Sequence, residues 1–165
     1  EMCIRDSISP ANTDYLYALV EAENNKQGLY FSKNKGESWN KVNKYVTSGN
    51  YYQEVFCDPL DQNKVFFMDT WLHHTVDGGK TVVKTGEKSK HVDNHCIWID
   101  SKDTDHWIVG CDGGIYETWD HASNWHYKPN LPITQFYKVA VDNDYPFYNI
   151  YGGTQDNNSI GGPSK

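Results

Sequence analysis

One turn pattern occurs three times in this 165-residue chain, at a constant interval. Its copies span residues 32–39, 75–82 and 118–125. Each copy begins with Ser or Thr, carries Asn or Asp two positions later, and carries Gly or Ala after two more. Gly36, Gly79 and Ala122 hold the same place, so successive copies lie 43 residues apart. A constant interval of this length indicates a repeated supersecondary unit.

The residue types in this pattern are suited to closing a tight turn. Asn and Asp side chains hydrogen-bond to the backbone just ahead of them, and Gly supplies a conformation that other residues adopt only with strain. The final aromatic can fill apolar space behind the turn. Ala122 departs from the pattern, and a positive φ there is costly. We therefore assign a structural role to these turn residues: Asn34, Gly36, Trp39, Asp77, Gly79, Asp120 and Trp125.

A second repeat runs in step with the first. Asp58, Asp100 and Asp142 are 42 residues apart, and each follows a short apolar run. A polar turn and another apolar run come next, at 65–68, 107–109 and 148–151. These runs are short, β-branched or aromatic, and bounded by turn residues, which predicts strands. No stretch has the period of a helix, so the expected fold is all-β.

Four antiparallel strands in about 43 residues is the size of a β-propeller blade. The predicted fold is a β-propeller fragment of about three and a half four-stranded blades, fewer than a closed propeller needs. The blades are expected at residues 8–46, 51–90, 91–130 and 135–165. A propeller of the Trp-Asp type is disfavoured, because Trp119-Asp120 lies inside a turn and does not recur.

Residues 1–7 are excluded from this partial propeller, which is placed at 8–165. Their codons would read GAG ATG TGT ATA AGA GAC AG, which resembles a transposase adapter used in sequencing libraries. These seven residues hold Arg5, the one arginine of the chain. The segment is therefore interpreted as a read-through scar.

Net charge and hydropathy limit the classes of partner that the chain could bind. The net charge is −7, which argues against nucleic acid or an anionic membrane as the main partner. No apolar run is long enough to span a bilayer, and no cofactor is predicted. Cys96 and Cys111 fall on adjacent predicted strands, and two free thiols are favoured over a disulfide there because its geometry is demanding.

The connections between blades are the expected functional surface. In a four-stranded meander, the loop between the second and third strands emerges at the same end as the connection to the next blade. The repeated turns lie at the other end. Candidate catalytic carboxylates at the loop end are Asp93, Asp112 and Asp156; candidate ligand-binding residues are His91, His95, Trp71, Tyr137, Gln155 and Asn157. Aromatics there, Tyr51 and Tyr52 included, are candidates to stack on sugar rings or to hold a peptide.

A metal site is one interpretation of the segment His91-Val92-Asp93-Asn94-His95. In an extended chain the two imidazoles and the carboxylate project to one side, and such groups suit zinc or manganese. A hydrogen-bonded polar cluster closing the channel mouth is the favoured interpretation, so no metal is predicted.

The repeated turn resembles the Asp-box, or BNR, hairpin, Ser/Thr-x-Asp-x-Gly-x-Thr-Trp. Nearly all of residues 8–165 resembles large bacterial exported BNR-repeat proteins labelled sortilin-type or glycosyl-hydrolase-like. The resemblance is most specific from His91 to Asp112 and from Gln135 to Asn157. In that group the loop usually reads Gly-Asn-Asp-Gly-Gly, whereas this chain has Cys111 in place of the Asn. The resemblance implies an extracellular or periplasmic location.

Two functions remain open. The favoured one is a module of a larger exported protein that binds a glycan or peptide on the loop-bearing face, with the remaining blades of the full-length chain as further partners. The alternative is a glycoside hydrolase of the xyloglucan-cleaving propeller type, with paired carboxylates in the same cleft. A sialidase is disfavoured, because that family grips its substrate with several arginines and residues 8–165 contain none.

Overall fold

The computed structural model describes residues 3–48, 52, 54–131, 135–155 and 158–165. It divides into two compact units, residues 1–127 and residues 128–165, and each is described by itself. The described residues contain strands and no helix, so the predicted all-β class is confirmed. None of them forms a helix that could cross a membrane.

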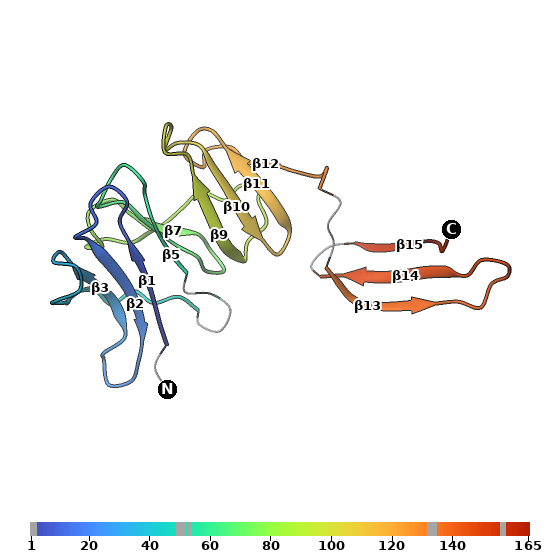
Figure 1. Cartoon of the computed structure of the whole chain (residues 1–165), viewed down its shortest axis with the longest axis horizontal. Helices are drawn as coiled ribbons and strands as arrows, with labels where there is room; N and C mark the ends of the chain where they lie inside the picture. The colour runs from blue at the N-terminus through green and yellow to red at the C-terminus, as the bar shows by residue number, and fades with distance from the viewer. Residues whose placement is uncertain (1–2, 49–51, 53, 132–134, 156–157) are drawn as a thin grey trace. The chain divides into compact units, whose positions relative to one another are not determined.

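Unit 1 consists of three four-stranded sheets in which consecutive strands pair antiparallel (Figure 1). The first sheet contains β1 (Cys3–Ile8), β2 (Leu16–Glu21), β3 (Gly28–Ser32) and β4 (Asn40–Asn43). The second contains β5 (Val55–Cys57), β6 (Val65–Phe67), β7 (His73–Thr75) and β8 (Val83–Lys84). The third contains β9 (Asn94–Ile99), β10 (Trp107–Cys111), β11 (Gly114–Thr118) and β12 (His126–Tyr127).

Unit 2 is a three-stranded antiparallel sheet. Its strands are β13 (Phe136–Val141), β14 (Asn149–Thr154) and β15 (Ser159–Pro163), paired in that order. Every residue of β13 is exposed. The second strands of the last three sheets, β6, β10 and β14, begin 42 residues apart, as the repeat predicts.

The first sheet differs from the prediction at its edge. Residues 1–7 lie outside the predicted propeller, whereas Cys3–Ile8 form β1 and pair with β2, from Cys3 opposite Glu21 to Ile8 opposite Leu16. Strand pairing uses backbone groups, so an edge strand demands little of its side chains. The pairing of these residues is independent of how they were encoded, and their adapter origin stays a hypothesis.

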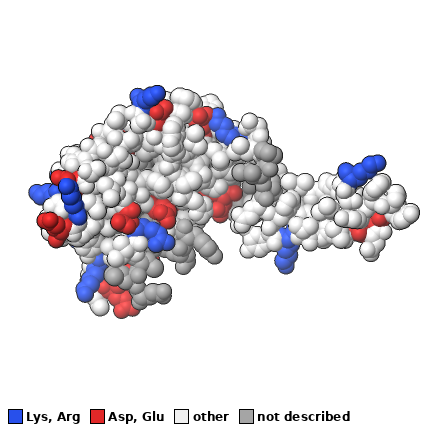
Figure 2. Space-filling view, viewed as in Figure 1, with Lys and Arg blue, Asp and Glu red and all other residues white. Residues whose placement is uncertain are grey.

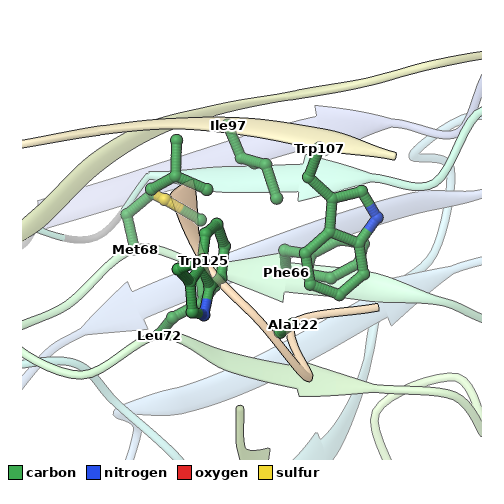
Figure 3. Close-up of a cluster of buried hydrophobic side chains, with 8 residues drawn as sticks. Phe66, Met68, Leu72, Ile97, Trp107, Ala122 and Trp125 are labelled. Carbon is green, nitrogen blue, oxygen red and sulfur yellow. The ribbon is translucent and has the colours of Figure 1, made fainter. Parts of the chain in front are cut away.

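The core of unit 1 lies between the sheets. Side chains of a strand alternate between its two faces, and β6 is apolar on both. Val65 and Phe67 pack against the first sheet, in a cluster with Tyr17, Leu19, Leu29 and Val55. Phe66 packs on the other face, in a second cluster. In Figure 3 the side chains of that cluster converge from the second and third sheets: Phe66, Met68, Leu72, Ile97, Trp107, Ala122 and Trp125.

The three repeated turns share one hydrogen-bond arrangement. In the second sheet, Thr75 Oγ1 accepts from Gly79 N at 3.0 Å and donates to Asp77 Oδ1 at 2.8 Å. Asp77 Oδ1 also accepts from Thr81 N at 2.9 Å. Equivalent bonds form in the other two copies, among Ser32, Asn34, Gly36 and Ser38, and among Thr118, Asp120, Ala122 and Asn124.

The second repeat also has a structural basis. The carboxylate of Asp58 accepts from Leu60 N at 2.9 Å, and Asp58 N donates to Lys64 O at 2.9 Å. Asp100 and Asp142 make the matching pair of bonds in the third and fourth sheets. In unit 2, bonds from the backbone and side chain of Asn149 lower the pKa of Asp142 to about 2. Each Asp therefore closes the turn between the first two strands of its sheet.

Backbone conformation at the turns leads to a testable difference between two glycines. Gly36 and Gly79 have φ of 85° and 90°, which is unfavourable for other residues by about 1–2 kcal/mol. A Cβ at Gly79 would lie 2.6 Å from Leu29 Cδ2, whereas a Cβ at Gly36 would meet nothing closer than 3.8 Å. We expect Gly79→Ala to lower the free energy of unfolding by about 2–4 kcal/mol, because overpacking adds to backbone strain.

Gly36→Ala is the matched control, with an expected loss of about 1 kcal/mol from the backbone alone. Urea denaturation of both variants, followed by circular dichroism, measures the difference. Equal losses at the two sites would mean that Gly79 does not pack against Leu29 as described.

Candidate functional site

Two aspartates, Asp93 and Asp112, lie side by side at the loop end of the third sheet. Asp93 immediately precedes β9 and Asp112 immediately follows β10. These strands pair with Cys111 opposite Asn94, so the two Asp residues come together beyond the last pair. Asp112 N donates to Asp93 O at 3.2 Å, and Asp93 N donates to Thr70 O of the second sheet at 2.8 Å. The connection between the sheets is thereby tied to the loop after β6.

Aromatic and imidazole side chains hold both carboxylates. His95 Nε2 lies 2.7 Å from Asp112 Oδ1, and the Tyr52 hydroxyl donates to Asp93 Oδ1 at 2.7 Å. The Tyr52 and His95 rings stack, with centroids 5.6 Å apart and planes at 22°. The side chains of His95 and Asp112 are 39% and 30% exposed, so the group is open to solvent. We call Tyr52, Asp93, His95 and Asp112 the loop-end cluster.

The protonation of Tyr52 is fixed by its surroundings. Burial, followed by the hydrogen bond to Asp93, raises the pKa of Tyr52 to about 12. The hydroxyl therefore stays protonated at neutral pH and donates to the Asp93 carboxylate. A donor held in this way fixes the orientation of the carboxylate.

The extended arrangement expected for residues 91–95 is wrong. Asp93 has a φ of 62°, so the chain turns there and the alternation of an extended strand does not apply. His91 instead packs on Gly113, where a Cβ would lie 2.4 Å from His91 Cβ. Its Nδ1 lies 2.9 Å from Val92 O. Within the part of the chain that the structure describes, no three His, Cys, Asp or Glu side chains are grouped to hold a metal ion.

Trp71 lies beside the residue that joins the two sheets. It follows Thr70, whose carbonyl accepts from Asp93 N. The side chain is exposed, and Lys84 Nζ lies 3.0 Å from its ring centroid, a cation–π contact. One face of the indole is therefore covered by the lysine.

The remaining ligand-binding candidates belong to unit 2 or are not described. Tyr137 lies in β13 with 73% of its surface exposed. Gln155 follows β14, and its N–H donates to Gln135 O at 2.9 Å. Asp156 and Asn157 lie outside the described residues, as does Tyr51. Their roles stay predictions.

The turn carboxylates lie at the other end of the sheets and are engaged in their own turns. Hydrogen bonds from Asn124 lower the pKa of Asp120 below its usual value. Burial would raise the pKa of Asp77, but the bonds from Thr81 and Thr75 outweigh it and the pKa is lowered. These contacts are those expected of residues that stabilise the turn.

The cysteines are free thiols among the described side chains. Cys96 lies opposite Gly110, and Cys111 lies opposite Asn94, because the register shifts between Gly110 and Cys111. Burial raises the pKa of the Cys111 thiol. The favoured expectation of free thiols at Cys96 and Cys111 agrees with this register.

Sequence reasoning missed a buried polar group between the second and third sheets. Lys90 Nζ lies 2.9 Å from Glu87 Oε1, and the two side chains are 0% and 1% exposed. Asn94, also fully buried, contacts both of them. Glu, Lys and Asn are common on surfaces, so no sequence signal distinguishes these three.

On the face drawn in Figure 2, basic and acidic side chains lie among one another, and neither sign forms a separate field. This face has no basic patch of the kind that binds nucleic acid.

The fold is that of a β-propeller, and this chain forms consecutive sheets of one. A GH74 enzyme from Niastella koreensis is similar over 97% of the chain, with a TM-score of 0.62 and 16% identity. A GH74 xyloglucanase from Xanthomonas campestris matches 98% of it, with a TM-score of 0.54 and 17% identity. YCF48 from Cyanidioschyzon merolae matches 99%, with a TM-score of 0.58 and 13% identity.

These similarities concern the fold. The chain spans 27% and 28% of the two GH74 enzymes and 56% of YCF48. No protein-family profile matches the chain, and no curated protein does.

Proposed function

We propose that this chain is part of a ligand-binding β-propeller module of a larger exported protein. The module binds a glycan or peptide at its loop end, through the loop-end cluster and the neighbouring Trp71. The resemblance to exported BNR-repeat proteins supports an extracellular or periplasmic location. The turn residues keep the structural role that their Asp-box resemblance implies.

The observation that carries this proposal is the hydrogen bonding of the two described carboxylates. Asp93 Oδ1 accepts a hydrogen bond from the Tyr52 hydroxyl at 2.7 Å, and Asp112 Oδ1 lies 2.7 Å from His95 Nε2. Both are held in a fixed orientation while the cluster stays open to solvent. Ordered acceptors near the partly buried Tyr52 ring and the exposed Trp71 indole suit the hydroxyl groups of a sugar or the amides of a peptide.

The structural neighbours are compatible with either ligand. One is a xyloglucanase, and another structure with this fold is YCF48 bound to the D1 peptide, with a TM-score of 0.51 and 17% identity. At such identities the likeness extends to the fold alone, so it supports the choice of ligands to test rather than the choice between them.

A glycoside hydrolase is the second candidate. Hydrolysis needs an acid and a second carboxylate about 5–10 Å apart across the scissile bond. Asp93 and Asp112 are two carboxylates at one end of a sheet, and Asp156 is the third candidate from the sequence. This arrangement makes cleavage worth testing in the same experiment.

Titration calorimetry with xyloglucan oligosaccharides and with a pool of short peptides tests the proposal, together with a reducing-sugar assay. We expect binding without cleavage, and about tenfold weaker binding for Asp93→Asn, because a hydrogen bond to a charged group contributes about 1.5–3 kcal/mol. Asp105→Asn is the matched control at the opposite end of the third sheet and is expected to bind as the wild type does.

The outcomes separate the two candidates. Wild-type cleavage that Asp93→Asn abolishes while binding persists supports the hydrolase. Binding that Asp93→Asn and Asp105→Asn leave equally strong places the ligand elsewhere. Absence of binding to both probes contradicts a glycan- or peptide-binding module.

A further inference from the structure

Three side chains with complementary chemistry are enclosed between the second and third sheets. Lys90 and Glu87 have side-chain exposures of 0% and 1%, and Asn94 is 0% exposed. The ring centroids of Trp125 and Tyr116 lie 5.4 Å and 5.9 Å from Lys90 Nζ. Water is excluded from an amine, a carboxylate and a carboxamide that touch one another.

The carboxylate stands between the two nitrogen atoms. Glu87 Oε1 lies 2.9 Å from Lys90 Nζ and 2.9 Å from Asn94 Nδ2. Lys90 Nζ also contacts Asn94 Oδ1, the oxygen of the same carboxamide. Leu72 N donates to the other carboxylate oxygen, Glu87 Oε2, at 3.0 Å and fixes its position. Glu87 is thus placed to carry a proton from the lysine nitrogen to the asparagine nitrogen.

We propose that Lys90 and Asn94 form an intramolecular isopeptide bond, with Glu87 as the proton carrier. Nucleophile, acceptor and proton carrier are held together without water, which is the proximity that such a reaction requires. The loop-end cluster is not involved, so the inference is independent of the proposed function.

The reaction needs no further reactant. Glu87 takes a proton from the Lys90 ammonium, and the free amine attacks Asn94 Cγ. Glu87 then protonates Nδ2 and takes a second proton from the attacking nitrogen. The Cγ–Nδ2 bond breaks and ammonia leaves. An ammonium, a carboxamide and a carboxylate thereby become a secondary amide, ammonia and a carboxylic acid, so atoms and charge balance.

The surroundings accommodate the product. Asn94 Nδ2 contacts Asp69 O and Thr70 O. Loss of this nitrogen leaves neither oxygen without a donor, because Asn94 N donates to Asp69 O at 3.0 Å and Asp93 N to Thr70 O at 2.8 Å. The product also replaces two buried charges by neutral groups, and buried charges are costly to keep in a protein interior.

Mass spectrometry of the purified, denatured 165-residue chain tests the proposal. We expect a mass about 17 Da below the value calculated from the sequence, because one ammonia is lost. Trypsin should leave residues 89–102 as one peptide with Lys90 uncleaved and the same mass deficit. A wild-type mass equal to the calculated value overturns the proposal.

Two variants identify the source of a mass deficit. Lys90→Arg keeps the positive charge but has no amine that can form this amide, and it is expected to show the full mass. The same deficit in Lys90→Arg would instead indicate a cyclic imide at Asn94 and would overturn the proposal. Glu87→Gln keeps the size of the proton carrier and is also expected to show the full mass. Bond formation in that variant would contradict the role of Glu87.

Discussion

Replacing Trp107 with alanine is expected to lower the free energy of unfolding by about 3–5 kcal/mol. Trp107 is fully buried between the second and third sheets. Its ring contacts Phe66 edge-on at a centroid distance of 4.9 Å, and its Nε1 donates to Thr104 O at 2.7 Å. The substitution therefore leaves a cavity and an unpaired carbonyl.

Trp119→Ala is the matched control, because Trp119 is 56% exposed. Its ring stacks on His106 at a centroid distance of 3.4 Å, so a loss of about 0.5–1.5 kcal/mol is expected. Urea denaturation followed by circular dichroism measures both variants. Similar losses for the two tryptophans would mean that the second and third sheets do not pack through Trp107.

Asp58→Ala is expected to lower the free energy of unfolding by about 3–5 kcal/mol, since it leaves a buried charge without its partner. Asp58 Oδ2 lies 3.2 Å from Lys64 Nζ, with side-chain exposures of 1% and 10%. Asp58 also accepts from the N–H groups of Leu60 and Asp61. Both the ion pair and the turn after β5 are lost.

Asp105→Ala is the control for this substitution. Asp105 also pairs with a basic group, His121, but its side chain is 61% exposed. Exposed pairs contribute about 0–1 kcal/mol, so a small change is expected. The two variants are compared by the same denaturation experiment. A loss for Asp58→Ala as small as that of the control would show that Lys64 finds another partner.

The fold was predictable because its information is local and repeated. Ser or Thr, Asn or Asp, and Gly at fixed offsets determine the hydrogen bonds of each repeated turn, and the interval between copies gives the length of a sheet. Ala122 adopts a φ of 66°, the costly conformation that its place in the pattern predicts. The edge strand β1 was missed, because edge pairing depends on the neighbouring strand more than on the side chains of the edge.

The candidate site was predictable only in part. Sheet topology brings Asp93, His95 and Asp112 to one end, and the structure places these side chains there. The direction of the Asp93 side chain depends on its positive φ. A positive φ is uncommon at residues other than glycine, so the sequence does not predict it. Lys90, Glu87 and Asn94 are close in sequence, between β8 and the first residue of β9. Their burial depends on how the second and third sheets pack around this segment, which the sequence of the segment does not contain.

The most direct measurement is an amide NMR titration of the chain with xyloglucan oligosaccharides and then with the peptide pool. The account predicts that one of these probes shifts the resonances of Tyr52, Asp93, His95 and Asp112, while those of the turn at residues 118–125 stay in place. Shifts confined to that turn, or no shifts with either probe, would contradict ligand binding at the loop end.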